Sequence, residues 1–102
     1  MRIEYCTRCK WFLRANWLQG ELLSTFEDDL KEVAMSPIKD PPGTFRVILN
    51  DNIVLWDRTL EATKGFPEAK ILKQIVRDKI SPTKSLGHSD VKIIEITDDK
   101  KL

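Results

Sequence analysis

Two cysteines of the chain, Cys6 and Cys9, are separated by two residues in the motif Cys-Thr-Arg-Cys. Cysteines at this spacing are typical of thiol–disulfide exchange, because the second sulfur can reach back to a mixed disulfide formed by the first. The thiolate is the reactive form, and in such motifs its pKa falls from about 8.5 into the range of about 3.5–7.5. Arg8 and Lys10 add positive charge, and no acidic residue lies between Cys6 and Lys10. The motif therefore predicts a redox function.

The residues around the motif predict a strand before it and a helix after it. Residues 3–5 alternate between apolar and polar side chains, as in a short strand. After the cysteines, apolar residues recur at the three- and four-residue spacings of an amphipathic helix. This apolar stripe consists of Trp11, Ala15, Leu18, Leu22, Phe26 and Leu30. The free N–H groups and the dipole at the start of this helix would stabilise a thiolate, and this geometry favours Cys6 as the exposed, attacking sulfur.

Further strands are predicted after the first helix. Residues 33–36 are a candidate second strand, which we expect to end at Pro37. The proline-rich segment 40–43 can continue neither a helix nor a central strand, so it marks a sharp loop. Residues 45–49 and 53–56 are rich in β-forming side chains and flank a short Asn/Asp turn, which predicts a hairpin.

A second helix is predicted to begin at Pro67, a favourable first helical residue, and to end near Ser81. Its apolar stripe consists of Leu72, Ile75, Val76 and Ile80. Residues 91–96 resemble a further strand, so we expect one domain over residues 1–90 and a C-terminal extension over residues 91–102. The order β-α-β-β-β-α predicts an α/β (α+β) fold with a four-stranded mixed sheet and two helices, because the first β-α-β unit pairs its strands in parallel.

Composition excludes several classes of protein. The chain has 102 residues, of which 41% are hydrophobic and 32% charged, and its net charge is +1. This length fits one domain whose core needs no disulfides, and the absence of a basic excess argues against a nucleic-acid-binding protein. No segment is apolar enough to span a membrane, and the first residues lack the apolar region of a secretory signal. We therefore expect a cytoplasmic protein, in a compartment where disulfides are seldom structural.

Three other interpretations of the cysteine pair remain open. A closed zinc site needs four ligands, and His88 is the only other soft ligand, so a zinc site would require two chains to meet. A structural disulfide across so short a loop would remove little entropy from the unfolded chain. Buried, unreactive thiols are common, although the position between a strand and a helix disfavours them here. His88 itself lies in a turn-like segment, where a histidine commonly hydrogen-bonds to its own loop.

Four segments of the chain resemble the Rdx family, which includes proteins similar to selenoproteins W, T and H. They are Tyr5-Cys6-Thr7-Arg8-Cys9, Gly43-Thr44-Phe45-Arg46-Val47, Gly65-Phe66-Pro67-Glu68 and Ser85-Leu86-Gly87-His88-Ser89-Asp90. The resemblance covers about residues 3–90 and implies a thioredoxin-like fold, in agreement with the element order above. It also implies a thiol-based redox protein, often linked to glutathione. In the selenoprotein members the second motif position, here Cys9, holds selenocysteine. The resemblance therefore favours Cys9 as the attacking residue, whereas the helix geometry favours Cys6.

Other residues near the motif are candidates for secondary roles. Leu13 and Trp17 point away from the apolar stripe, and tryptophan is enriched at binding hot spots. They are therefore candidates for a partner or homodimer surface, unless another element of the chain covers them. Trp11 and Phe12 follow the motif directly and are expected in the core. Pro42 is a candidate for the cis proline that thioredoxin-like folds often hold beside the motif.

We therefore expect a thiol–disulfide redox protein in which Cys6 and Cys9 cycle between dithiol and disulfide. The partners would be protein thiols or glutathione, the latter as a co-substrate. No metal or nucleotide cofactor is implied, because the sequence has no Gly-rich phosphate loop and no ligand cluster. The alternatives are a non-catalytic, redox-responsive binding module whose surface includes Leu13 and Trp17, and a zinc-bridged dimer.

Overall fold

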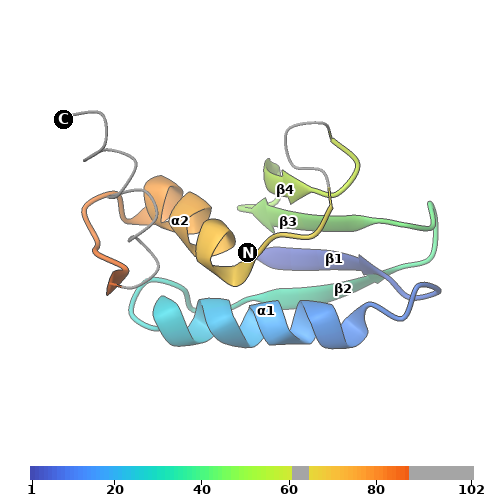
Figure 1. Cartoon of the computed structure of the whole chain (residues 1–102), viewed down its shortest axis with the longest axis horizontal. Coiled ribbons are helices and arrows are strands. Elements are labelled where there is room, and N and C mark those ends of the chain that lie inside the picture. Colours follow the sequence, from blue (N-terminus) through green and yellow to red (C-terminus); the bar gives the residue numbers. More distant parts are fainter. Residues whose placement is uncertain (61–64, 88–102) are drawn as a thin grey trace, which may run out of the picture. The chain divides into compact units, whose positions relative to one another are not determined.

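A computed structural model describes residues 1–60 and 65–87 (Figure 1). The predicted order β-α-β-β-β-α is confirmed, with a four-stranded mixed sheet and two helices. The elements are β1 (Arg2–Cys6), α1 (Phe12–Thr25), β2 (Ala34–Ile38), β3 (Phe45–Leu49), β4 (Ile53–Asp57) and α2 (Ala69–Ile80). They fall into two compact units, Met1–Pro67 with the sheet and α1, and Glu68–Leu102 with α2.

The sheet has the strand order β2-β1-β3-β4, so β1 is a central strand. It pairs in parallel with β2, where Glu4 lies opposite Ser36, and antiparallel with β3, where Glu4 lies opposite Arg46. Parallel neighbours need a crossover connection, which α1 supplies. The β3–β4 hairpin turns through Asn50 and Asp51, both with positive φ, as the Asn/Asp turn predicts. Cys6 therefore ends a strand that is hydrogen-bonded on both sides.

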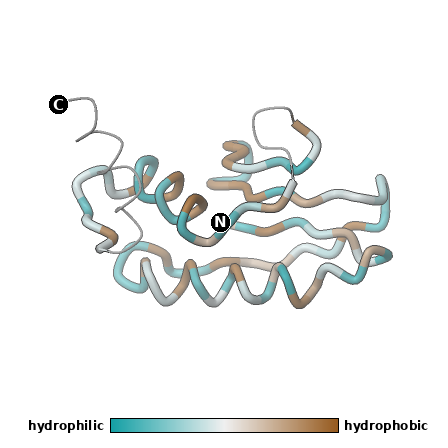
Figure 2. The backbone as a smooth tube through the Cα atoms, in the orientation of Figure 1, coloured by the Kyte–Doolittle hydropathy of each residue, from teal (hydrophilic) through white to brown (hydrophobic). Residues whose placement is uncertain are grey.

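Helix α1 runs alongside β1 and β2 and buries Ala15, Leu18 and Leu22 (Figure 1). Hydrophobic and hydrophilic residues alternate along this helix, whereas β3 contains a hydrophobic stretch (Figure 2). The apolar spacing predicts a helix that continues to Leu30, but α1 ends at Thr25. Phe26 is fully buried beyond that end, and its carbonyl accepts the N–H of Leu30 at 2.7 Å. The apolar residues after Thr25 thus lie in turns, although their spacing in the sequence is that of a helix.

Strand β2 extends further than its composition predicts. The strand was expected to end at Pro37, but it includes this residue and ends at Ile38. Because β2 is an edge strand, a residue without an N–H group can be accommodated there. Pro37 lies opposite Tyr5, so the parallel pairing continues up to the cysteine motif.

Helix α2 begins later than predicted. Pro67 was expected as its first residue, but Glu68 still has an extended backbone (φ −72°, ψ 147°), and the helix begins at Ala69. Its buried side chains are Leu72, Gln74 and Val76, whereas Ile75 and Ile80 of the predicted stripe are half-buried. The predicted end near Ser81 is confirmed.

Some predictions lie outside the described residues. These are the strand at 91–96, the domain boundary after residue 90, and the environment of His88. Over residues 1–60 and 65–87, no helix combines the length and the apolar character that crossing a membrane requires.

Candidate functional site

Cys6 is the last residue of β1, and Cys9 lies in the turn between β1 and α1. Backbone hydrogen bonds hold this turn: the N–H of Thr7 donates to the Ile38 carbonyl at 3.1 Å, and that of Lys10 donates to the Thr7 carbonyl at 3.3 Å. Lys10 has a φ of 59°, in the left-handed region, which reverses the chain direction. The turn brings the Cys9 thiol within hydrogen-bonding reach of the Cys6 sulfur, and both cysteines are free thiols.

The two thiols differ in exposure. Cys6 is 0% exposed, whereas Cys9 is half-buried. The expectation that Cys6 is the exposed sulfur is therefore wrong, because this residue ends a central strand and lies in the interior. Of the two cysteines, Cys9 is therefore the one that solvent reaches.

The hydrogen bond between the thiols shifts their pKa values in opposite directions. The Cys9 thiol donates to the Cys6 sulfur and thereby lowers the pKa of Cys6, and the backbone amides of Gly43, Cys9 and Arg8 act in the same direction against burial. The same hydrogen bond raises the pKa of Cys9, as does burial, while the Gly43 amide and the positive charge of Arg58 oppose this rise. The buried Cys6 is thus the favoured thiolate of the pair.

The amides around the sulfurs do not belong to α1. The sequence predicts that the first N–H groups of this helix stabilise a thiolate, but α1 begins only at Phe12. The amides that act on Cys6 come instead from the turn, at Arg8 and Cys9, and from a distant loop, at Gly43. The electrostatic effect is the expected one, with loop amides in place of helix amides.

Gly43 lies at the end of the predicted sharp loop, and its φ of 87° is in the region that favours glycine. The loop contains a cis peptide bond between Asp40 and Pro41, so the cis proline is Pro41 and not the candidate Pro42. The hydroxyl of Thr44 donates to the Pro41 carbonyl at 2.8 Å and closes the loop before β3. This conformation places the Gly43 amide against both sulfurs.

Arg58, just beyond β4, is a residue that the sequence analysis missed. Its Nε donates to the carbonyl of Gly43 at 3.0 Å, and its backbone N–H donates to the carbonyl of Phe45 at 3.0 Å. Its guanidinium lies over the Trp11 ring, 5.1 Å from the centroid. No pattern in the sequence connects Arg58 with the cysteines, because only the folded chain brings the hairpin end to the proline-rich loop.

An aromatic cluster supports this side of the site. Trp11 packs edge-on against Phe66 with ring centroids 4.7 Å apart, and Phe66 packs against the fully buried Phe45 at 5.1 Å. Trp11 is half-buried in this cluster, where a core position was expected. Phe12 was also expected in the core, but it is 48% exposed, and its ring is tilted by 59° against that of Tyr5 at a centroid distance of 5.8 Å. The expectation for Phe12 is therefore wrong.

Leu13 and Trp17 are 76% and 55% exposed. The prediction that they face outward from α1 is confirmed for the described part of the chain. Phe12 is exposed as well, and we call these three apolar residues on the first turns of α1 the α1 surface. Whether a partner or a second copy binds there stays a prediction.

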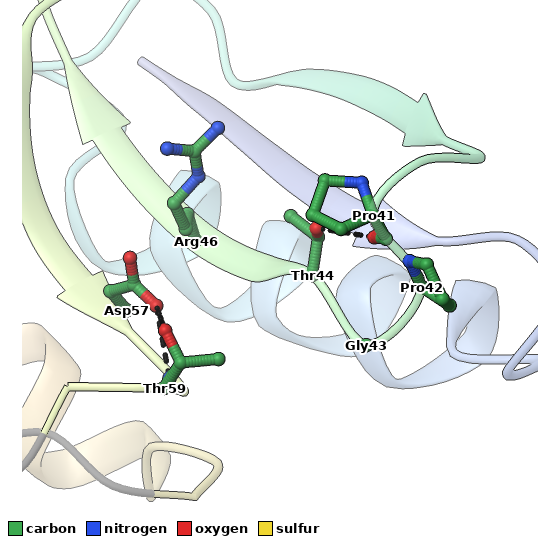
Figure 3. A pocket seen from close by; sticks show the side chains of 7 residues that line it. All are labelled: Pro41, Pro42, Gly43, Thr44, Arg46, Asp57 and Thr59. Carbon is green, nitrogen blue, oxygen red and sulfur yellow. Dashed lines mark hydrogen bonds between the residues drawn. The ribbon is translucent and has the colours of Figure 1, made fainter.

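A pocket of about 280 Å³ lies beside Gly43 (Figure 3). Its lining residues are Pro41, Pro42, Gly43, Thr44, Arg46, Asp57 and Thr59. Arg46 and Asp57 are register partners on β3 and β4 and bring opposite charges to the pocket. Oδ1 of Asp57 accepts hydrogen bonds from the Thr59 backbone N–H at 2.9 Å and hydroxyl at 2.7 Å. Gly43 lines the pocket and its amide also acts on both sulfurs, whereas neither cysteine lines the pocket.

A buried carboxylate, that of Glu4, forms ion pairs with two partly exposed arginines and connects the strands that hold the site. Glu4 lies two residues before Cys6 on the same face of β1, and its carboxylate is paired with Arg46 of β3 and with Nε of Arg2 at 3.0 Å. Arg2 also reaches the exposed carboxylate of Asp51 at 3.4 Å. These pairs connect β1 to β3 where the cysteine motif begins.

No group of three or more metal-ligating side chains occurs within the part of the chain that the structure describes. His88, the additional ligand considered for a zinc-bridged dimer, lies outside that part. The zinc interpretation therefore stays a prediction.

Comparisons with known proteins agree with this fold. The Rdx family matches residues 1–78. The crystal structure of a Bordetella parapertussis protein is similar, with 53% sequence identity, a TM-score of 0.70, and coverage of 78% of this chain and 94% of that one. The selenoprotein W-related protein from Vibrio cholerae has 45% identity, a TM-score of 0.70 and the same coverage, 78% and 94%. No curated protein matches the chain.

Proposed function

The chain belongs to the Rdx family, and we propose that it acts as a thiol–disulfide redox protein through Cys6 and Cys9. The observation that carries this proposal is that Cys6 and Cys9 are free thiols joined by a hydrogen bond from Cys9 to Cys6, with Cys9 half-buried and Cys6 buried. A reactive dithiol requires one accessible sulfur and a second within reach of it. Fold and family support a redox role in general, and the geometry of the pair supports this form of it.

In the first step, the Cys9 sulfur attacks a substrate disulfide R–S–S–R′. The lowered pKa of Cys6 favours its thiolate form, which is free to accept the proton of the Cys9 thiol along the hydrogen bond between them. A bond forms between the Cys9 sulfur and R–S, the substrate S–S bond breaks, and R′–S⁻ leaves. The Gly43 amide contributes to both pKa values and stabilises negative charge on either sulfur during this transfer.

In the second step, Cys6 loses its proton to the departed thiolate and attacks the Cys9 sulfur. The Cys6–Cys9 disulfide forms and R–S⁻ leaves, so the dithiol is oxidised by two electrons and the substrate is reduced to two thiols. Cys6 needs no exposure for this role, since its target is the neighbouring sulfur. A thiol donor then reverses both steps and restores the dithiol.

The substrates in this proposal are glutathione disulfide, glutathione-mixed disulfides or protein disulfides, with glutathione as a co-substrate rather than a resident cofactor. The pocket beside Gly43 would hold the part of the substrate beyond its sulfur. Its opposite charges at Arg46 and Asp57 suit polar, peptide-like groups. A reducing compartment such as the cytoplasm would supply the thiol donor.

A second candidate function rests on the α1 surface. Phe12, Leu13 and Trp17 lie exposed directly after the motif, and a change in the cysteine pair would be transmitted to them through the turn. In this candidate, the protein binds a protein partner or a second copy in one oxidation state and catalyses nothing. It is a redox-responsive binding module.

Turnover distinguishes the two functions. Purified protein is assayed for the reduction of disulfides with glutathione or with thioredoxin reductase as electron donor. We expect turnover in the wild type and its loss in Cys9→Ser, with retained folding by circular dichroism. If no donor supports turnover, while a partner or a dimer forms in one oxidation state only, the proposal is overturned and the binding module is supported.

A further inference from the structure

We propose that Arg58 is the positioning residue of the dithiol: its guanidinium anchors Gly43 against the two sulfurs and places a fixed positive charge beside Cys9. The inference rests on the proposed function, because it concerns the same cysteine pair. It assigns a role to a residue outside the motif, contributed by the end of the hairpin.

The contacts of Arg58 fix its position from several sides. Its backbone N–H donates to the Phe45 carbonyl, and its own carbonyl accepts the N–H of Gly65 at 3.1 Å. Its Nε donates to the Gly43 carbonyl at 3.0 Å, and its guanidinium stacks over Trp11. A guanidinium is planar, permanently charged and able to donate and stack at once, so this position uses properties that lysine does not share.

Gly43 leaves the space that this contact needs. A Cβ atom at Gly43 would lie 3.0 Å from Nη2 of Arg58, which is closer than ordinary van der Waals contact. The guanidinium therefore packs directly against the backbone of Gly43. Arg58 thus holds the peptide group that follows Gly43, while the N–H of Gly43, in the preceding peptide group, faces Cys6 and Cys9.

The charge of Arg58 acts on the sulfur that meets the substrate. It lowers the pKa of Cys9, against the rise caused by Cys6 and by burial. As Cys9 becomes negative during attack, an anchored cation stabilises that charge without any rearrangement. Arg58 touches neither the substrate nor the sulfur in this account, so it positions and polarises rather than catalyses.

The test measures the pKa of Cys9 in the Cys6→Ser background, where Cys9 is the single thiol. The rate of alkylation by iodoacetamide is recorded against pH for this protein and for the same protein with Arg58→Gln or Arg58→Lys. We expect Arg58→Gln to raise the pKa of Cys9 and to slow alkylation at neutral pH about three- to tenfold. Arg58→Lys keeps the charge and should recover part of the loss.

Arg14→Gln is the matched control. Arg14 also stacks on the aromatic cluster, with its guanidinium 4.1 Å from the Phe66 centroid, but it is not among the groups that shift the pKa of Cys9. The proposal is overturned if Arg58→Gln leaves the alkylation profile at that of the Cys6→Ser parent, or if Arg14→Gln shifts it equally. If Arg58→Gln does not fold, the result for Arg58→Lys is used instead. An alkylation profile and a free energy of unfolding identical to those of the Cys6→Ser parent would contradict the anchoring role of Arg58.

Alkylation does not depend on turnover with a disulfide. If the proposed redox function fails, the turnover assay is negative while the effect of Arg58 on the Cys9 profile persists. If the assignment of Arg58 fails, turnover persists while the profile is insensitive to the substitution. The two failures are therefore distinguishable.

Discussion

Cys9 donates a hydrogen bond to Cys6, and the donor is the half-exposed thiol while the acceptor is fully buried. The sulfur whose thiolate form is favoured is therefore not the sulfur that solvent reaches. In the proposed function, this separation gives the two residues different tasks: Cys9 would form the mixed disulfide, and Cys6 would accept its proton and later resolve the mixed disulfide.

The first prediction concerns the pKa of Cys9 without its partner. Cys6 raises the pKa of Cys9 through the hydrogen bond and through the repulsion between two negative sulfurs. A serine at position 6 cannot ionise, so Cys6→Ser should lower the pKa of Cys9. The pH dependence of Cys9 alkylation, followed by mass spectrometry, measures this shift. A midpoint at or above that of Cys9 in the wild type would contradict the coupling.

The second prediction concerns Gly43. Gly43→Ala forces a side chain into a backbone with φ of 87° and against Arg58, so we expect a loss of about 1–2 kcal/mol in the free energy of unfolding. Gly20→Ala is the control, since nothing lies within 4 Å of that position in α1, and it should stabilise the protein by roughly 1 kcal/mol. Urea denaturation measures both. Equal effects of the two substitutions would be inconsistent with a constrained Gly43.

The third prediction concerns the buried carboxylate of Glu4. Glu4→Gln removes the negative charge between Arg2 and Arg46, and it should lower the free energy of unfolding by about 1–3 kcal/mol. The double variant Glu4→Gln, Arg46→Met should lose less than the sum of the two single variants, because the pair is removed together. Additive losses in urea denaturation would show that Glu4 and Arg46 are not coupled.

The fourth prediction concerns the pH dependence of stability at Asp57. Burial raises the pKa of Asp57, but hydrogen bonds from Thr59 and the charges of Arg46 and Arg58 outweigh it and hold the pKa below its ordinary value of 3.8. Asp57 then binds a proton more readily in the unfolded chain than in the folded one. The stabilisation that its carboxylate gives to the folded protein is therefore complete at pH values above 3.8, and it is lost as pH falls through the folded pKa.

Asp57→Asn should therefore destabilise the protein by about 1 kcal/mol at neutral pH, and the difference from wild type should shrink towards acid pH. Thermal unfolding at a series of pH values measures the difference. Asp28→Asn, at an exposed position after α1, serves as the control. A stability difference between Asp57→Asn and the wild type that grows as pH falls would contradict the prediction.

The periodic patterns of the sequence predict the element order, because apolar spacing follows the geometry of helices and strands directly. They fail where other interactions decide an element's end: buried Phe26 continues the helical spacing in turns, and Pro37 fits an edge strand. The motif identifies Cys6 and Cys9, but their exposure depends on the place of β1 within the sheet. Gly43 and Arg58 reach the site through long-range contacts that leave no periodic signal.

Trapping of the mixed disulfide tests the central claim most directly. Cys6→Ser and Cys9→Ser are each incubated with glutathione disulfide under native conditions, and the mass of the intact protein is measured. Cys6→Ser should gain one glutathionyl group on Cys9, whereas Cys9→Ser should stay unmodified because its remaining thiol is buried. Capture by Cys9→Ser alone, or by neither variant, would contradict the assignment of Cys9 as the attacking sulfur.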